Sequence, residues 1–242
     1  MNPQERLIVA LDVDTLEKAI HLTKLLSPHV GAFKVGMQLY NSVGPEVIYT
    51  LKNLGANIFI DLKLHDIPNT VAQASKVLTS HGVNILNVHA AGGKEMMQSA
   101  AQAVSQAAQE QGIPRPLVIA VTVLTSISHQ VFQEEIGFAG EIEAKVVAWA
   151  KLAKEAGLDG VVASPKEIKA LRQACGPDFV IITPGIRPSG GAMNDQKRVT
   201  TPQEAIAAGA TYIVVGRPIT ACSNPIEAAK SIVSEMLTRA TS

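Results

Sequence analysis

The chain has 242 residues, of which 47% are hydrophobic and 17% charged, so it can bury a core and disorder is not expected. Lys plus Arg and Asp plus Glu both number 21, so no charge imbalance favours a nucleic-acid or membrane partner. The two cysteines lack metal-type spacing, residues 1–6 show no signal-peptide pattern, and no apolar run reaches about 18 residues. We therefore expect a cytoplasmic protein that does not span a membrane.

Short apolar runs alternate along the chain with longer segments of helical spacing. The runs predicted as β-strands are residues 7–13, 32–36, 57–64, 85–89, 117–123, 160–163, 179–183 and 212–215. The predicted helices are residues 15–26, 45–54, 69–81, 94–110, 142–156, 165–174, 202–208 and 225–238. Because the strands are continuously apolar rather than alternating, they fit parallel strands that are covered on both faces.

Eight β-α units in one chain of this length predict a single (β/α)8 TIM barrel, with residues 1–242 as one domain. The competing architecture is a doubly wound open sheet. No glycine-rich dinucleotide-binding pattern follows the first strand, which favours the barrel. No linker rich in Pro, Gly or Ser divides the chain.

Ionisable residues follow or interrupt three consecutive predicted strands. Asp12 follows the first strand, Lys34 lies within the second, and Asp61 and Lys63 end the third. Active sites of such barrels form at the carboxyl ends of the strands, and residues two apart on a strand share a face. We therefore expect an alternating Asp-Lys-Asp-Lys array in the barrel mouth. The alternative is a buried salt-bridge network that only closes the barrel.

Residues suited to bind an anion follow the seventh and eighth strands, where barrels often bind phosphate. Gly216 and Arg217 follow the eighth strand, and Arg187 follows the seventh. The glycine-rich loop 187–198, which includes Gln196, is predicted to be a lid over a bound phosphate. The alternatives are a turn with a surface arginine and a disordered surface loop.

The ten residues 61–70, Asp-Leu-Lys-Leu-His-Asp-Ile-Pro-Asn-Thr, resemble the signature of the orotidine 5′-phosphate decarboxylase family. The resemblance extends over the whole chain through shorter segments at 7–12, 33–36, 123–126, 183–187, 194–196 and 215–217. The ten-residue motif is specific. Its shorter D-x-K-x-x-D core is shared with related sugar-phosphate decarboxylases and aldol-type synthases.

This resemblance implies that orotidine 5′-phosphate is decarboxylated to uridine 5′-phosphate in pyrimidine biosynthesis, without a cofactor or metal, and that Lys63 protonates C6. The charged array would consist of Lys34, Asp61, Lys63 and Asp66. The family works as a homodimer with shared sites, which Asp66 and Thr70 would reach from the neighbouring subunit. The resemblance also implies that Asp12 contacts the ribose and that Thr125 contacts the pyrimidine. It implies that the phosphate is bound by Arg187, Gln196, Gly216 and Arg217.

Two other functions stay open from the sequence. A magnesium-dependent 3-keto-gulonate 6-phosphate decarboxylase or hexulose-phosphate synthase shares the motif core, but such sequences tend to carry an acid where this chain has Lys34. A catalytically silent phosphate-binding barrel would not need Asp61, Lys63 and Asp66 together. Asp66 also has a purely structural interpretation, as the N-cap of the helix that follows it.

Overall fold

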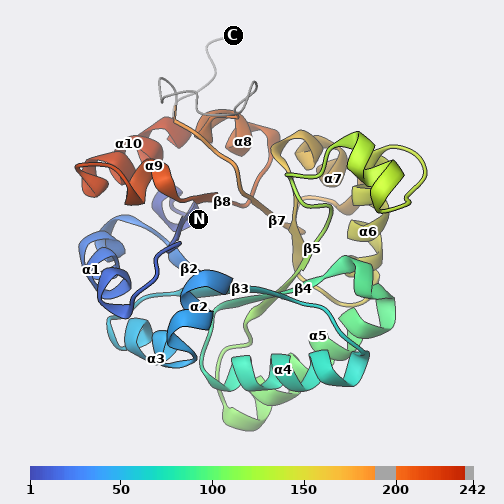
Figure 1. Cartoon of the computed structure of the whole chain (residues 1–242), viewed down its shortest axis with the longest axis horizontal. Coiled ribbons are helices and arrows are strands. Elements are labelled where there is room, and N and C mark those ends of the chain that lie inside the picture. The colour runs from blue at the N-terminus through green and yellow to red at the C-terminus, as the bar shows by residue number, and fades with distance from the viewer. Residues whose placement is uncertain (189–199, 238–242) are drawn as a thin grey trace.

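The computed structural model describes residues 1–188 and 200–237. Its eight parallel strands pair in sequence order and close into a barrel, because β1 pairs with both β2 and β8 (Figure 1). The strands are β1 (Leu7–Ala10), β2 (Ala32–Gly36), β3 (Ile58–Leu64), β4 (Ile85–His89), β5 (Leu117–Val121), β6 (Gly160–Val162), β7 (Val180–Thr183) and β8 (Tyr212–Val215). The predicted (β/α)8 barrel is confirmed, and the open sheet is excluded.

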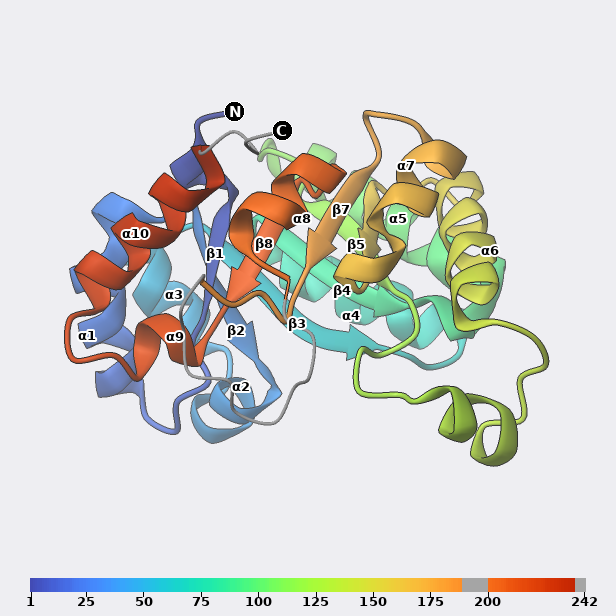
Figure 2. The ribbon, with the colours of Figure 1, turned by 90° about the horizontal axis from the view of Figure 1, so that it is seen from above.

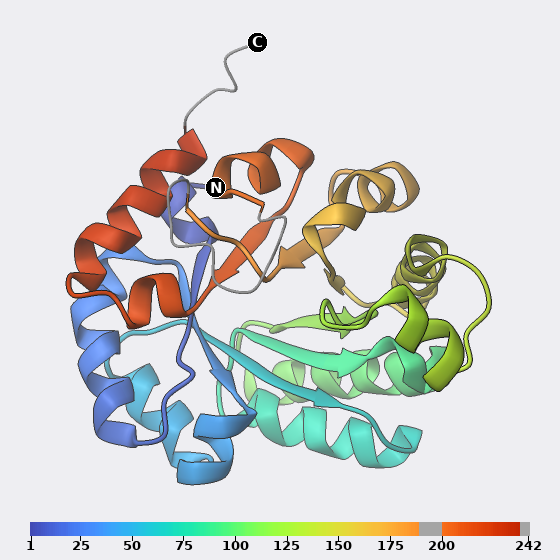
Figure 3. The same ribbon diagram turned by 45° about the horizontal axis from the view of Figure 1, so that its top comes forward.

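Helices surround the barrel, and the last of them, α10, lies beside α1, so that the outer ring closes as the sheet does (Figure 3). The main helices are α1 (Leu16–Leu26), α3 (Glu46–Asn53), α4 (Pro68–Ser80), α5 (Gly93–Gln111), α6 (Ile142–Glu155), α7 (Ile168–Cys175), α8 (Pro202–Ala208) and α10 (Pro225–Leu237). They match the predicted helices to within a few residues. Among the described residues, no helix has both the length and the apolar character needed to cross a bilayer.

Three of the short elements that the sequence did not predict lie near the carboxyl ends of the strands. They are α2 (Met37–Val43), α9 (Arg217–Thr220) and the π-helical turn Val131–Glu135. Figure 2 shows all three on the side toward which the strand arrows point, opposite the N-terminus. Each spans at most two turns, which is too short for a helical repeat of apolar residues to stand out.

The inside of the barrel is filled by one apolar layer, contributed by Ile8, Ala10, Ala32, Phe59, Ile85, Ile119, Ile182 and Val214. Residues two further along these strands face inward as well, because side chains alternate along a strand. Lys34, Asp61 and Asn87 occupy such positions, directly above the apolar layer. The pairing register therefore directs polar side chains from neighbouring strands into the barrel mouth.

Candidate active site

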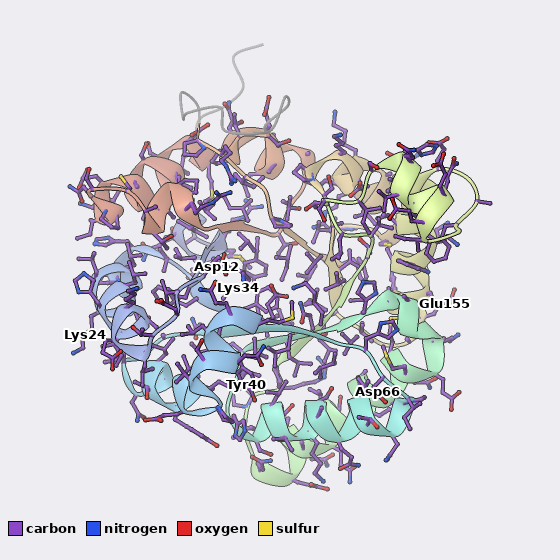
Figure 4. All side chains as sticks on the ribbon, viewed as in Figure 1. Asp12, Lys24, Lys34, Tyr40, Asp66 and Glu155 are labelled. Carbon is purple, nitrogen blue, oxygen red and sulfur yellow. The ribbon has the colours of Figure 1, made fainter. Side chains whose placement is uncertain are left out.

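Four charged side chains from the first three strands form a continuous chain of ion pairs in the mouth. Lys34 Nζ lies 3.2 Å from Asp12 Oδ1 and 3.4 Å from Asp61 Oδ2, and Lys63 Nζ lies 2.8 Å from Asp61 Oδ1. The side chains of Lys34 and Asp61 are only 13% and 14% exposed. Figure 4 shows Asp12 and Lys34 together near the centre of the barrel. The predicted Asp-Lys-Asp-Lys array is therefore present.

Asp61 is the centre of this cluster and is held in its charged form. Burial would raise the pKa of its carboxyl group, because a charge is poorly solvated away from water. The positive charges of Lys34 and Lys63, with hydrogen bonds from Lys63 and Asn87, outweigh burial and lower the pKa below its usual value. A largely buried carboxylate therefore remains ionised between two ammonium groups.

The backbone at Lys63 does not follow a regular strand. Ile60 pairs with Leu86 of β4, but the next paired residue on β3 is Leu64, opposite Val88, so the ladder contains a bulge. Lys63 has φ +53°, in the left-handed region that residues other than glycine seldom adopt. Simple alternation along the strand is thus the wrong explanation for the meeting of Lys63 and Asp61, although the two side chains do meet.

A cavity of about 230 Å³ adjoins the charged cluster. Lys34, Asp61 and Lys63 line one part of it, and Phe59 and Val214 of the interior layer also line it. Thr125, the residue predicted to contact the pyrimidine, lines the same cavity. The cavity thus combines charged groups with apolar surface, as sites for small polar molecules commonly do.

Two glycines leave room in this region. A Cβ atom at Gly36 would lie 2.9 Å from Lys34 Nζ, and one at Gly216 would lie 3.6 Å from Asp12 Oδ2. A side chain at Gly36 would have to displace the Lys34 ammonium group, whereas a Cβ atom at Gly216 would make only ordinary van der Waals contact with Asp12. Gly216, predicted as a phosphate contact, therefore lies beside the residue predicted to bind ribose.

The two described arginines of the predicted phosphate site follow neighbouring strands. Arg187 comes after β7 and Arg217 begins α9 directly after β8, and these strands pair through Thr183 and Ile213. Arg217 is exposed, whereas Arg187 is half-buried and donates to the carbonyl oxygen of Ile186 at 3.0 Å. Gln196 and the predicted lid from residue 189 onward lie outside the described residues.

The structure does not bring Asp66 and Thr70 into this cluster within one chain. Both are exposed, and Figure 4 shows Asp66 at the periphery, far from Asp12 and Lys34. The N-cap interpretation of Asp66 is wrong, because Ile67 is the N-cap of α4 and no side chain caps that helix. Asp66 Oδ1 instead accepts a hydrogen bond of 2.7 Å from the backbone N–H of Ile67.

Asn87 is a site residue that the sequence prediction missed. Its Nδ2 donates to Asp61 Oδ1 at 2.7 Å, and its Oδ1 accepts from the backbone N–H of Lys63 at 2.8 Å. The signal was present as a lone amide between Leu86 and Val88, in a strand that is apolar apart from Asn87 and its last residue, His89. Buried polar side chains need partners, so its isolation indicated a polar neighbour.

A second cavity, of about 470 Å³, lies beside the first and shares Thr125 with it. Glu167 lines this cavity, is 7% exposed, and its Oε2 has no hydrogen-bond partner. Burial raises the pKa of this carboxyl group to about 7, with a backbone hydrogen bond from Ser164 opposing the shift and the charge of Glu143 adding to it. Folding therefore favours the protonated form of Glu167.

This raised pKa predicts that Glu167→Gln changes how stability depends on pH. Between pH 4.5 and about 7 the folded protein keeps a proton on Glu167 that the unfolded chain releases, so wild-type stability falls as pH rises through this window. The loss is at most about 3 kcal/mol, and Glu167→Gln should remove it. Urea unfolding at pH 5 and pH 8 measures the difference, with the exposed Glu17→Gln as control. Equal pH dependence in both variants would refute the assignment.

Comparison with known proteins places these features in a family context. Residues 5–232 match the family model described as "Orotidine 5′-phosphate decarboxylase / HUMPS family". The orotidine 5′-phosphate decarboxylase of Syntrophomonas wolfei is 54% identical, over 98% of this chain and 99% of the relative, and that of Moorella thermoacetica is 52% identical, over 98% and 94%. The crystal structure of orotidine 5′-phosphate decarboxylase from Lactobacillus acidophilus superposes with a TM-score of 0.85 at 42% identity, covering 96% of this chain and 99% of that one.

Proposed function

Because the chain belongs to the orotidine 5′-phosphate decarboxylase / HUMPS family, we propose that it converts orotidine 5′-phosphate to uridine 5′-phosphate and carbon dioxide, without a cofactor. The observation that carries the proposal is the ammonium group of Lys63, 2.8 Å from Asp61 at the wall of a cavity of about 230 Å³. The relatives at about 50% identity all carry the name of this enzyme.

Lys63 is the proposed proton donor. Loss of carbon dioxide leaves an electron pair in an sp² orbital at C6, where the π-system of the ring cannot delocalise it. A fixed positive charge at this point stabilises the carbanion as it forms, and electrostatic stabilisation of this kind is often the largest catalytic contribution. The same ammonium group then transfers a proton to C6.

Asp61 is the proposed partner of Lys63 and a source of negative charge near the substrate carboxylate. Its lowered pKa keeps it ionised, so it opposes the charged carboxylate of the bound substrate and no longer does so once carbon dioxide has left. Lys34, 3.4 Å from Asp61, helps to keep this carboxylate charged and would position the ribose together with Asp12.

The remaining substrate contacts are assigned to residues around the mouth. Thr125 lines the cavity and would contact the pyrimidine. The phosphate would be held by Gly216, by Gln196, and by Arg187 and Arg217 after two neighbouring strands. Phosphate contacts far from C6 can increase the rate if their binding energy orders the site around the reacting carbon.

We further propose a homodimer in which Asp66 and Thr70 complete the active site of the partner. Both residues are exposed, Figure 4 shows Asp66 at the periphery of its own chain, and the large apolar side chain of Ile67 is exposed as well. A reducing cytoplasmic location, as expected for pyrimidine biosynthesis, fits the two free cysteines, of which Cys222 is exposed.

The direct test is to mix the purified protein with orotidine 5′-phosphate and follow its ultraviolet absorbance, with and without EDTA. We expect turnover that EDTA leaves unchanged, because the ammonium of Lys34 lies between Asp12 and Asp61, where metal-dependent relatives tend to carry an acid. Activity that EDTA abolishes and Mg²⁺ restores would instead favour the sugar-phosphate enzymes. Tight nucleotide binding without turnover would indicate a non-catalytic barrel.

A further inference from the structure

We propose that Asn87 is a positioning residue that uses both ends of its side-chain amide to hold the reactive pair, fixing Asp61 through Nδ2 and the backbone of Lys63 through Oδ1. This inference rests on the proposed function, since it concerns how the proton donor is aimed. It differs from the assigned roles in that Asn87 does not itself line the cavity and is not among the predicted substrate contacts, but acts through Asp61 and Lys63, which line the cavity.

The orientation of this amide is determined by its partners. A carboxylate can only accept a hydrogen bond and a backbone N–H can only donate one, so Nδ2 must face Asp61 and Oδ1 must face Lys63. The distances are 2.7 Å and 2.8 Å, and Asn87 is only 1% exposed. Because the Asn87 amide is buried, both hydrogen bonds restrain the atoms they join more strongly than they would in water.

The bulge in β3 explains why Lys63 needs this support. Regular pairing with β4 stops after Ile60 and resumes at Leu64, and the side chain of Asn87 supplies a partner for the Lys63 N–H within the interruption. Lys63 is also the one residue other than glycine with positive φ among residues 1–188 and 200–237. Such a conformation persists only where the surroundings hold it.

The same amide directs the carboxylate of Asp61. Oδ1 accepts from both Lys63 Nζ and Asn87 Nδ2, while Oδ2 faces Lys34 Nζ. Three donors at two oxygens define the plane of the carboxylate. Asn87 adds a hydrogen-bond donor to the Asp61 carboxylate without adding charge, so the net charge of Asp61 and the two lysines is unchanged.

Two substitutions separate the roles of the two ends. Asn87→Ala removes both hydrogen bonds. We expect kcat to fall by about 10²-fold and KM to change by less than about threefold, because Lys63 would lose its orientation toward the reacting carbon. Asn87→Asp keeps an acceptor for the Lys63 N–H but sets a second carboxylate against Asp61. The two acids would then share a proton, and the acid side of the kcat/KM profile should move up by at least about one pH unit.

Asn84→Ala is the matched control. Asn84 lies at the opposite end of the same strand pair, and its Oδ1 accepts a hydrogen bond of 2.9 Å from the backbone N–H of Ile58 in β3. Its loss should lower stability without changing the pH profile. If the Asn87 variants are destabilised like Asn84→Ala but keep wild-type kcat and pH profile, Asn87 is merely structural and the proposal is overturned.

Other charged groups that face Asp61 and Lys63 also influence the acid side of the kcat/KM profile. These groups are Asp12 after β1, Lys34 on β2, and His89 on β4, which interacts electrostatically with Lys63 and stacks on His65 at 5.3 Å. Burial, with the positive charges of His65 and Lys63, lowers the pKa of His89. His89→Gln in the Asn87→Asp background should therefore leave the new acid-side ionisation in place.

NMR measurements on the unliganded protein test the proposal without depending on turnover. In the wild type, the Asn87 side-chain amide resonances should follow the titration of Asp61, and the Lys63 backbone N–H should exchange slowly with deuterium. In Asn87→Asp, the pKa of Asp61 should rise. The proposal would be overturned if, in the wild type, the Asn87 amide resonances did not respond to the titration of Asp61 and the Lys63 backbone N–H exchanged rapidly. This outcome can be read even if the variants fail to fold. Absent turnover in the wild type would refute the proposed function alone.

Discussion

Replacing Lys63 by alanine should lower kcat by about 10⁴-fold or more, because the change removes both the proton donor and the fixed charge at the reacting carbon. The barrel should stay folded, since Lys63 lies at the rim and not within the apolar layers. Steady-state turnover of orotidine 5′-phosphate measures the effect, and circular dichroism checks the fold. Near-native turnover would remove Lys63 from its proposed role.

A glycine variant separates catalysis from stability at this position. Lys63 has φ +53°, where glycine is favoured, so Lys63→Gly should be more stable than Lys63→Ala by about 1 kcal/mol. Both variants should be equally inactive. Lys230→Ala, which removes an exposed lysine on the outer helix α10, is the control and should retain full turnover.

The inactive Lys63 variant also tests the shared active site. Asp66→Asn should be inactive too, although Asp66 lies far from the cluster in its own chain. In a mixed dimer of the two variants, one site has both an intact Lys63 and an intact Asp66 from the partner. Random mixing should restore about one quarter of wild-type turnover. Failure of mixed dimers to regain activity would contradict the shared site.

Replacing Arg217 by alanine should weaken binding of orotidine 5′-phosphate by about 10²-fold or more, because charge-assisted hydrogen bonds to a phosphate are lost. Arg217 is exposed and begins a short helix directly after β8, so the substitution should leave the fold intact. Isothermal titration calorimetry with the product nucleotide measures the change. Unchanged affinity would exclude Arg217 from the phosphate site.

A comparison of ligands makes the Arg217 experiment specific. Binding of the nucleoside uridine, which lacks the phosphate, should be equal in the wild type and in Arg217→Ala. Arg217→Lys should give an intermediate affinity for the nucleotide, since lysine keeps the charge but loses the two-pronged geometry of the guanidinium. An equal loss of affinity for nucleoside and nucleotide would point to a distorted pocket instead.

Much of the barrel could be predicted because the signals are local. Each apolar run and each amphipathic segment is defined by its own residues, so β2, β4, α8 and β8 were predicted with the observed bounds. The placing of Lys34 and Asp61 in the barrel mouth followed from the same local order, since both lie in the carboxyl-terminal half of strands whose carboxyl ends meet in a barrel.

The short elements were beyond such local reasoning, and only the family resemblance, not the local pattern, indicated that Asp66 would serve a neighbouring subunit. Helices α2 and α9 span at most two turns, so their local signal is too weak to separate them from loops. Asp66 belongs to the same motif as Lys63, yet the chain carries it away from the cluster. Adjacent positions in a motif need not meet in one subunit, because the direction of a loop depends on packing with distant residues.

The sequence by itself determined the eight-unit barrel, the charged residues at its strand ends and, through the motif at 61–70, the family. Only the tertiary structure decided the bulge at Lys63, the hydrogen-bond partners of Asn87 and the burial of Glu167. Those features arise where separate elements meet, and their energies come from desolvation and hydrogen bonds across the barrel. Such interactions exist only once separate elements have packed together, so a local pattern such as the lone amide of Asn87 can indicate a buried polar group without identifying its partners.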